Sequence, residues 1–118
     1  MLRVIVESPY AGDVERNTRY ARAAVRDCVL RGEAPIASHL LYTQPGILRD
    51  DMPEERAQGI EAGLAWGSVA EASVFYVDLG WSSGMLAALD RAVALGRATE
   101  PRSLPSWDAR GPEREGTP

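Results

Sequence analysis

The strongest constraint on the fold is a regular alternation of short apolar runs with longer amphipathic segments. Residues 2–8, 33–38 and 72–78 are short, mostly apolar runs, and their composition is typical of strands. Between and after them lie segments whose apolar residues recur at helical spacing, namely residues 13–31, the stretch that begins at Pro53, and residues 84–95. The chain therefore alternates strand and helix three times.

Such an order is typical of α/β folds, in which right-handed crossovers bring successive strands into one parallel sheet with helices on both faces. We predict a three-layer α/β/α domain of the flavodoxin or Rossmann-like class, with a parallel sheet of four or five strands. The first and third strands should be central, because residues 72–78 are almost continuously apolar. Residues 97–102 could add a short edge strand.

The apolar spacing also predicts which side of each helix is buried against the sheet. The expected buried residues are Val14, Ala21, Ala24, Val25, Cys28 and Val29 in the first helix, Ala57, Ile60, Leu64 and Val69 in the second, and Met85, Leu86, Leu89, Ala92 and Val93 in the third. The length of 118 residues suits one domain. We expect this domain to span residues 1–102 and residues 103–118, which lack periodicity, to form a flexible tail.

Composition excludes several functional classes. A net charge of −4 argues against a general nucleic-acid-binding protein. The single cysteine, Cys28, excludes an intramolecular disulfide and a cysteine-based zinc cluster, and the one histidine has no partner at ligand spacing, so we expect no metal and no cofactor. No apolar run reaches 18 residues and the N-terminus does not resemble a signal peptide, so we expect a cytoplasmic protein without membrane association.

In open parallel sheets, ligands bind beyond the carboxyl ends of the strands. Three segments should therefore line one crevice: "SPYAGD" after the first strand, "SHLLY" after the second and "DLGWSSG" after the third. The side chains and backbone groups of these segments are the candidate ligand-binding residues: Ser8, Tyr10, Gly12, Asp13, His39, Asp78, Ser82, Ser83, Gly84 and Met85.

Each polar residue of the crevice also has a purely structural interpretation. Asp78 could bind ligand hydroxyls or base edges, or it could cap backbone N–H groups at the end of its strand. Ser82, Ser83 and Gly84 precede a helix whose free N–H groups favour an anion, yet a serine there could simply cap the helix.

The other candidates have similar alternatives. His39 could donate to a phosphate or transfer a proton, or it could be structural. Tyr10 could stack on a base, or it could be a half-buried turn aromatic, and Asp13 is expected to cap the first helix whatever else it does. Trp66 and Trp81 are interpreted as packing or oligomer contacts.

The ordered motifs "VIVESPYAGD", "ASHLLYTQPGIL", "ERAQGIEAGLAW" and "ASVFYVDLGWSSGMLAALDRAVALGR" resemble the nucleoside 2-deoxyribosyltransferase-like superfamily, in particular its small bacterial and phage domains of unknown function. The resemblance covers residues 2–102. It implies the fold predicted above, a nucleoside- or nucleotide-like ligand, and a homo-oligomer.

The resemblance also implies a reaction in which a glutamate nucleophile displaces the base from a deoxyribosyl group. That glutamate belongs to a pattern like "SxGxxxE", which places it on Ala88 of "SSGMLAALD", and a second carboxylate of the superfamily falls near Gly63. Both carboxylates are thus absent, and Glu61 and Asp90 lie on other helical faces. The implied cradle, from Tyr10 and His39 to the segment 78–85, is retained.

We therefore carry three functional hypotheses. The favoured one is a protein that binds a nucleoside or nucleotide, to sequester or sense it, without the superfamily's nucleophile. The alternative is an active N-glycosidase or deoxyribosyltransferase that uses a displaced carboxylate, with Asp78, Glu7 and Glu61 as candidates. The third is a structural or interaction protein.

Overall fold

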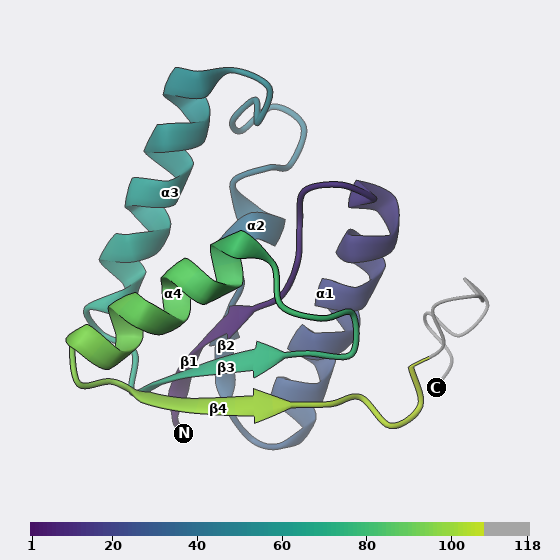
Figure 1. The fold of residues 1–118 in the computed structure, drawn as a ribbon, viewed down its shortest axis with the longest axis vertical. Coiled ribbons are helices and arrows are strands. Elements are labelled where there is room, and N and C mark those ends of the chain that lie inside the picture. The colour runs from purple at the N-terminus through teal and green to yellow at the C-terminus, as the bar shows by residue number, and fades with distance from the viewer. Residues whose placement is uncertain (108–118) are drawn as a thin grey trace.

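The computed structural model describes residues 1–107 and confirms the predicted three-layer α/β architecture (Figure 1). The elements in chain order are β1 (Arg3–Glu7), α1 (Val14–Leu30), β2 (Ala34–Ile36), α2 (Ser38–Leu41), α3 (Pro53–Gly67), β3 (Ala72–Tyr76), α4 (Ser83–Ala94) and β4 (Ala98–Arg102). The four strands form one parallel sheet in the order β2-β1-β3-β4, so the first and third strands are central, as predicted.

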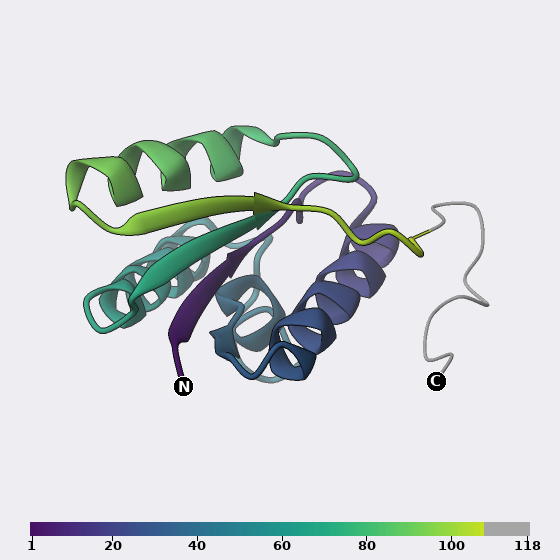
Figure 2. The same cartoon turned by 90° about the horizontal axis from the view of Figure 1, so that it is seen from below.

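The helices cover the two faces of the sheet unequally (Figure 2). Helix α1 packs against β1 and β2 on one face, and α4 packs against β3 and β4 on the other. Helix α3 lies on the same side as α4 but packs mainly against α2. The face of the sheet between α3 and α4 is therefore incompletely covered, and this arrangement determines where the site lies.

Both edge strands contain a proline, Pro35 in β2 and Pro101 in β4. Proline has no N–H to donate, so within a sheet it is confined to edges and bulges. At the two edges these prolines also discourage pairing with a further strand.

The main core lies between the sheet and α1. Its largest fully buried side chains include Tyr20 and Tyr76, and Val4, Val6 and Val74 pack with them. Helix α1 is well capped, because the Asp13 carboxylate accepts a hydrogen bond from the N–H of Arg16, as the sequence predicts.

A buried ionic network crosses this core. Arg102 at the end of β4 donates two hydrogen bonds of 2.7 Å to the carboxylate of Glu33, which precedes β2. The side chains of Arg102 and Glu33 are only 7% and 13% exposed. Arg102 also donates to the hydroxyl of Tyr76, which itself donates to Asp27. The guanidinium of Arg102 therefore links β4, at one edge of the sheet, to the residue that precedes β2, at the other edge.

Several predicted buried positions are wrong. Val14, Val29, Ala57, Ile60, Leu64, Val69, Leu86 and Val93 are exposed. In α1 the buried stripe is rotated toward Asn17 and Tyr20. Helix α3 does not lie flat on the sheet, and α4 buries its small and flexible residues Met85 and Ala92 instead of its branched ones.

Residues 103–107 are not a loose tail. Leu104 is buried in the main core, and the ring of Trp107 lies edge-on to Tyr20 at a centroid distance of 4.9 Å. The rest of the predicted tail, residues 108–118, lies outside the described residues. The domain thus continues at least five residues beyond the predicted boundary at residue 102.

The Arg102 network generates a stability prediction. Replacing Arg102 by alanine leaves the Glu33 carboxylate buried without its donors, and we expect this to lower the free energy of unfolding by about 3 kcal/mol. Arg3→Ala is the matched control, because its ion pair with Glu71 is exposed, and it should cost under about 1 kcal/mol. Urea unfolding measures both values, and equal losses would contradict the structural role of Arg102.

Candidate functional site

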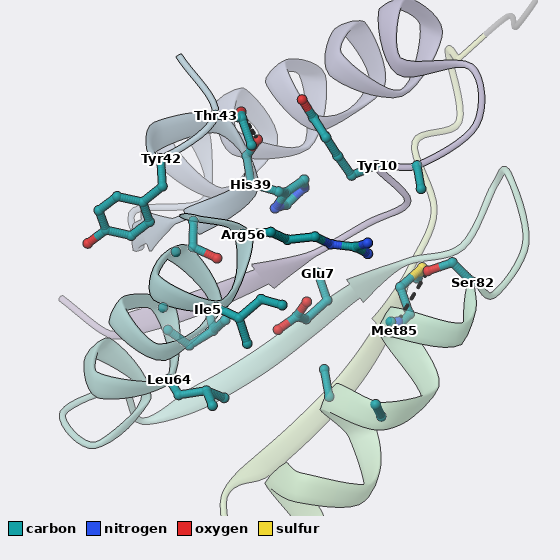
Figure 3. Close-up of a pocket in the computed structure, with 18 of the residues that line it drawn as sticks. Ile5, Glu7, Tyr10, His39, Tyr42, Thr43, Arg56, Leu64, Ser82 and Met85 are labelled. Atoms are coloured by element: carbon teal, nitrogen blue, oxygen red, sulfur yellow. Dashed lines mark hydrogen bonds between the residues drawn. The ribbon is translucent and has the colours of Figure 1, made fainter. Parts of the chain in front are cut away.

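A cavity of about 600 Å³ lies at the carboxyl ends of β1 and β2, between α3 and the start of α4 (Figure 3). Its size is within the range of small-molecule sites in proteins. The topology predicted a ligand site beyond the carboxyl ends of the strands, and the cavity lies at that end of the sheet. It is bounded by the loop after β1, by α2, by α3 and by the first turns of α4.

The cavity brings together most of the predicted site residues. Its lining includes Glu7, Ser8, Tyr10, His39, Ser82, Ser83, Gly84 and Met85. It also includes Gly63 and Ala88, the two positions where the superfamily resemblance places carboxylates. Residues from β1, α2, α3 and α4, which are far apart in the sequence, therefore line the same cavity.

Four predicted residues do not line the cavity. The Asp78 carboxylate accepts a hydrogen bond of 2.6 Å from the Tyr20 hydroxyl and one of 2.8 Å from the N–H of Leu104. Its side chain therefore packs on the α1 side of the sheet, away from the cavity. Gly12 adopts a φ of 99°, which favours glycine in the turn before α1, and Asp13 caps that helix. Glu61 is exposed on α3.

Glu7, the last residue of β1, points its carboxyl group into the cavity (Figure 3). Within residues 1–107 this carboxyl group has neither a hydrogen bond nor an ion pair, although the Glu7 backbone belongs to the pairing of β1 with β3. Burial raises the pKa of Glu7 to about 7, and the nearby positive charge of Arg97 opposes this rise. The cavity thus contains a carboxyl group that changes protonation near neutral pH, a property that is concentrated at functional sites.

Ser8 and His39 form a second polar group beside Glu7. The Ser8 Oγ and the His39 Nε2 are 2.7 Å apart, which holds the imidazole at the cavity wall. His39 lies on the short helix α2, not at the end of the second strand as predicted. Burial lowers the pKa of His39 to about 4, so the ring is neutral at physiological pH. The ring of Tyr10 lies edge-on to it at 6.4 Å.

A buried asparagine that the sequence interpretation missed positions the first loop. Asn17 of α1 is 1% exposed, and its amide donates hydrogen bonds to the carbonyl groups of Tyr10 and Ala11. The loop is thereby fixed with Tyr10 at the cavity. Only the position of Asn17 one turn into the helix could have indicated this role.

The sequence interpretation also missed the positive charges of the site. Arg56 of α3 extends across the cavity (Figure 3). Arg91 of α4 also lines it. Arg97 donates to the hydroxyl of Ser73 and the carbonyl of Gly67, so its guanidinium is fixed beneath the cavity wall. Arg56 and Arg91 lie on helices, and Arg97 lies between α4 and β4.

The start of α4 has the capping role that the sequence predicts as one of two alternatives. The Ser82 Oγ caps the helix by accepting a hydrogen bond of 3.1 Å from the N–H of Met85. The N–H groups of Ser83 and Gly84 have no hydrogen-bond acceptor within residues 1–107. A helix start of this kind favours a negatively charged or oxygen-rich ligand group.

Glycines on α3 bring this helix close to its neighbours. Gly59, Gly63 and Gly67 recur every fourth residue and all line the cavity. A Cβ atom at Gly63 would lie 2.8 Å from the Ser38 Oγ, so a side chain there requires Ser38 to move. A carboxylate at this position would not fit the present packing of α2 against α3.

The part of the chain that the structure describes contains no cluster of three or more histidine, cysteine, aspartate or glutamate residues that could hold a metal ion. Within that part, no helix is both long enough and apolar enough to cross a membrane.

Glu7 and His39 generate opposite predictions for the pH dependence of stability. The folded-state pKa of Glu7 lies above its ordinary value of 4.5, so its contribution is lost as the pH rises through 7. The folded-state pKa of His39 lies below 6.5, so its contribution is lost as the pH falls through 4. The two effects should largely cancel between pH 4.5 and 6.5 in the wild-type protein.

Single variants should separate the contributions of Glu7 and His39 to the pH dependence of stability. Glu7→Gln should be more stable than wild type by roughly 1–3 kcal/mol at pH 8, and this gain should shrink at pH 4.5. His39→Gln should show its gain at pH 4.5 and lose it at pH 8. Thermal melts across this range provide the measurement, and a pH-independent difference between Glu7→Gln and wild type would contradict the assignment.

Comparison with known proteins identifies one family. The family model described as Domain of unknown function (DUF7768) matches residues 2–101. No curated protein matches the chain.

Proposed function

The chain belongs to the DUF7768 family, whose description names no activity. From the cavity itself, we propose that the protein binds a nucleoside or nucleotide-like small molecule. The observation that carries this proposal is the set of unsatisfied polar groups that share one partly apolar cavity of about 600 Å³. A nucleotide combines a planar ring, hydroxyl groups and an anion. The cavity offers a complement to each of them.

The complementary groups are distributed around the cavity wall. Tyr10 and His39 line the cavity, and their rings and polar atoms suit a base or sugar. The N–H groups of Ser83 and Gly84 and the guanidinium of Arg56 suit a phosphate. Glu7 suits a group that donates hydrogen bonds, which is the part that the sequence interpretation gave to Asp78.

The resemblance to the nucleoside 2-deoxyribosyltransferase-like superfamily supports the same ligand class. It also supports binding without the superfamily's covalent route, because Ala88 supplies only a methyl group and Gly63 only a hydrogen atom at the cavity wall. We therefore infer that the protein holds its ligand, to sequester or sense it.

A second candidate function is hydrolysis of an N-glycosidic bond. One observation favours it: among the three displaced carboxylates considered, Asp78, Glu7 and Glu61, only Glu7 lines the cavity. Its pKa of about 7 suits a general acid that protonates a departing base. With no second carboxylate at position 63 or 88, we expect this activity to be negligible.

The ligand prediction is tested by calorimetry with a panel of nucleosides and their 5′-monophosphates. We expect at least one monophosphate to bind, and Arg56→Ala to weaken its binding about tenfold while leaving the nucleoside unaffected. Arg49→Ala is the matched control, because Arg49 is exposed and bonds to Asp51 outside the cavity.

Chromatography of the same mixtures detects any free base. Rapid base release that disappears in Glu7→Gln would establish the second candidate and refute the binding role. A panel that shows no binding at all would refute both.

We also propose that the chain forms a homo-oligomer. The support is apolar surface on α3 and α4, where Ile60, Leu64, Leu86 and Val93 are 56%, 40%, 50% and 64% exposed. Of the two tryptophans that the sequence suggested as contacts, Trp66 is 47% exposed and donates to the Tyr42 hydroxyl, and Trp81 stacks on Phe75.

Light scattering coupled to size exclusion tests the oligomer. At micromolar concentration we expect a mass above the 12.8 kDa of one chain, and Val93→Glu should shift it toward the monomer by placing a charge in the contact. The exposed Leu30→Glu on α1 is the control and should leave the mass unchanged. A monomer at all concentrations would contradict the proposal.

A further inference from the structure

The Glu7 carboxyl group has acceptor oxygens that no part of residues 1–107 satisfies, although it lies at the centre of a formed cavity (Figure 3). An ionised carboxylate only accepts hydrogen bonds, and its two oxygens match a pair of donors that lie side by side. A ligand that covers Glu7 buries these oxygens, and burying them without donors is costly. Such a ligand must therefore supply the donors itself.

The neighbouring charged groups do not satisfy Glu7. The positive charge of Arg97, which follows α4, favours the ionised form of Glu7, but Arg97 donates its hydrogen bonds to Ser73 and Gly67. Arg56 of α3 forms an ion pair with Asp50 at 3.9 Å, and Glu55 accepts a hydrogen bond from the N–H of Arg49.

The remaining elements do not satisfy it either. From α2, the neutral His39 bonds to Ser8 through Nε2. From α4, Arg91 lines the cavity without an ion pair to Glu7. The unmet acceptors of Glu7 therefore face the cavity.

Apolar side chains flank Glu7 on both sides. Ile5 and Leu64 lie on one side and Met85 on the other, so the space around the carboxyl group suits the edge of a flat ring (Figure 3). Among the common bases, guanine alone presents two adjacent N–H donors, at N1 and the 2-amino group, on one edge. Hypoxanthine presents only the N1 donor, and adenine and cytosine pair an amino donor with a ring acceptor.

Resting on the proposed function, we infer that Glu7 selects the base, and that the preferred ligand is a guanine nucleoside or nucleotide bound through its N1–H and 2-amino group. A site that needs a particular donor rejects the analogue that lacks it, because the acceptor is then left buried and unpaired. Glu7 is thus a specificity-determining residue, and the cavity discriminates between ligands that differ by one amino group.

The protonation state of Glu7 adds a second signature. With a pKa of about 7, Glu7 is largely ionised at pH 8 and largely neutral at pH 6 in the free protein. The neutral acid offers one donor and one acceptor, which no longer match the two donors of guanine. His39 stays neutral over this range because its pKa is about 4, and the cavity arginines stay charged.

The test compares guanosine 5′-monophosphate with inosine 5′-monophosphate by calorimetry, since the two differ only in the 2-amino group. At pH 8 we expect the guanine nucleotide to bind the wild-type protein about tenfold or more tightly. Lowering the pH to 6 should reduce this preference severalfold. Glu7→Gln should remove most of it, while Glu61→Gln, on the exposed side of α3, should keep it.

The outcomes separate the inference from the function on which it rests. Equal binding of the two nucleotides to wild type at pH 8, or a preference unchanged by pH, would overturn the role of Glu7 and leave nucleotide binding intact. Both results are measured on the wild-type protein, so neither requires that a variant folds. If neither these nor any other nucleotide binds, the proposed function fails and the inference with it.

Discussion

The close approach of α3 to α2 determines the character of the site. Gly59 and Gly63 present no side chains to Tyr42, Leu48 and Ser38, and α3 therefore rests on α2 instead of lying flat on the sheet. A helix packed on the sheet would have filled the space above β1. Here that space is an open cavity, and Glu7 is left inside it.

The two faces of the sheet differ in how their acidic side chains are paired. On the α1 face, the described side chains pair their charges internally: Arg102 with Glu33, Tyr76 with Asp27, and Tyr20 with Asp78. On the α3 and α4 face, the Glu7 carboxyl group and the N–H groups of Ser83 and Gly84 have no such partners within residues 1–107. The α1 face is thus held together by paired polar side chains, whereas these polar groups of the other face are open to the cavity.

The sequence contained enough information for the fold but only part of the site. Strand and helix order follow from apolar patterning, and topology then places Ser8, His39 and Ser83 at one edge. The pattern could not separate Glu7 from Asp78. Both are acidic residues at or just after the end of a central strand, but the side chains of Glu7 and Asp78 leave their strands toward opposite layers.

The errors in the helices have a related cause. The stripe of Ile60 and Leu64 was expected to face the sheet, because helical spacing identifies an apolar side without identifying its partner. In the fold this side borders the cavity and the solvent. The glycines that recur every fourth residue in α3 were the overlooked signal, since they show which side of the helix approaches its neighbour.

The central claim, that this cavity holds a small molecule, is tested most directly by native mass spectrometry. The protein would be incubated with a mixture of nucleosides and nucleotides and compared with Ala88→Phe, which places a ring in the cavity wall. We expect one ligand per chain on the wild-type protein and its loss in the variant. An unliganded wild-type protein, or an adduct that persists in Ala88→Phe, would contradict it.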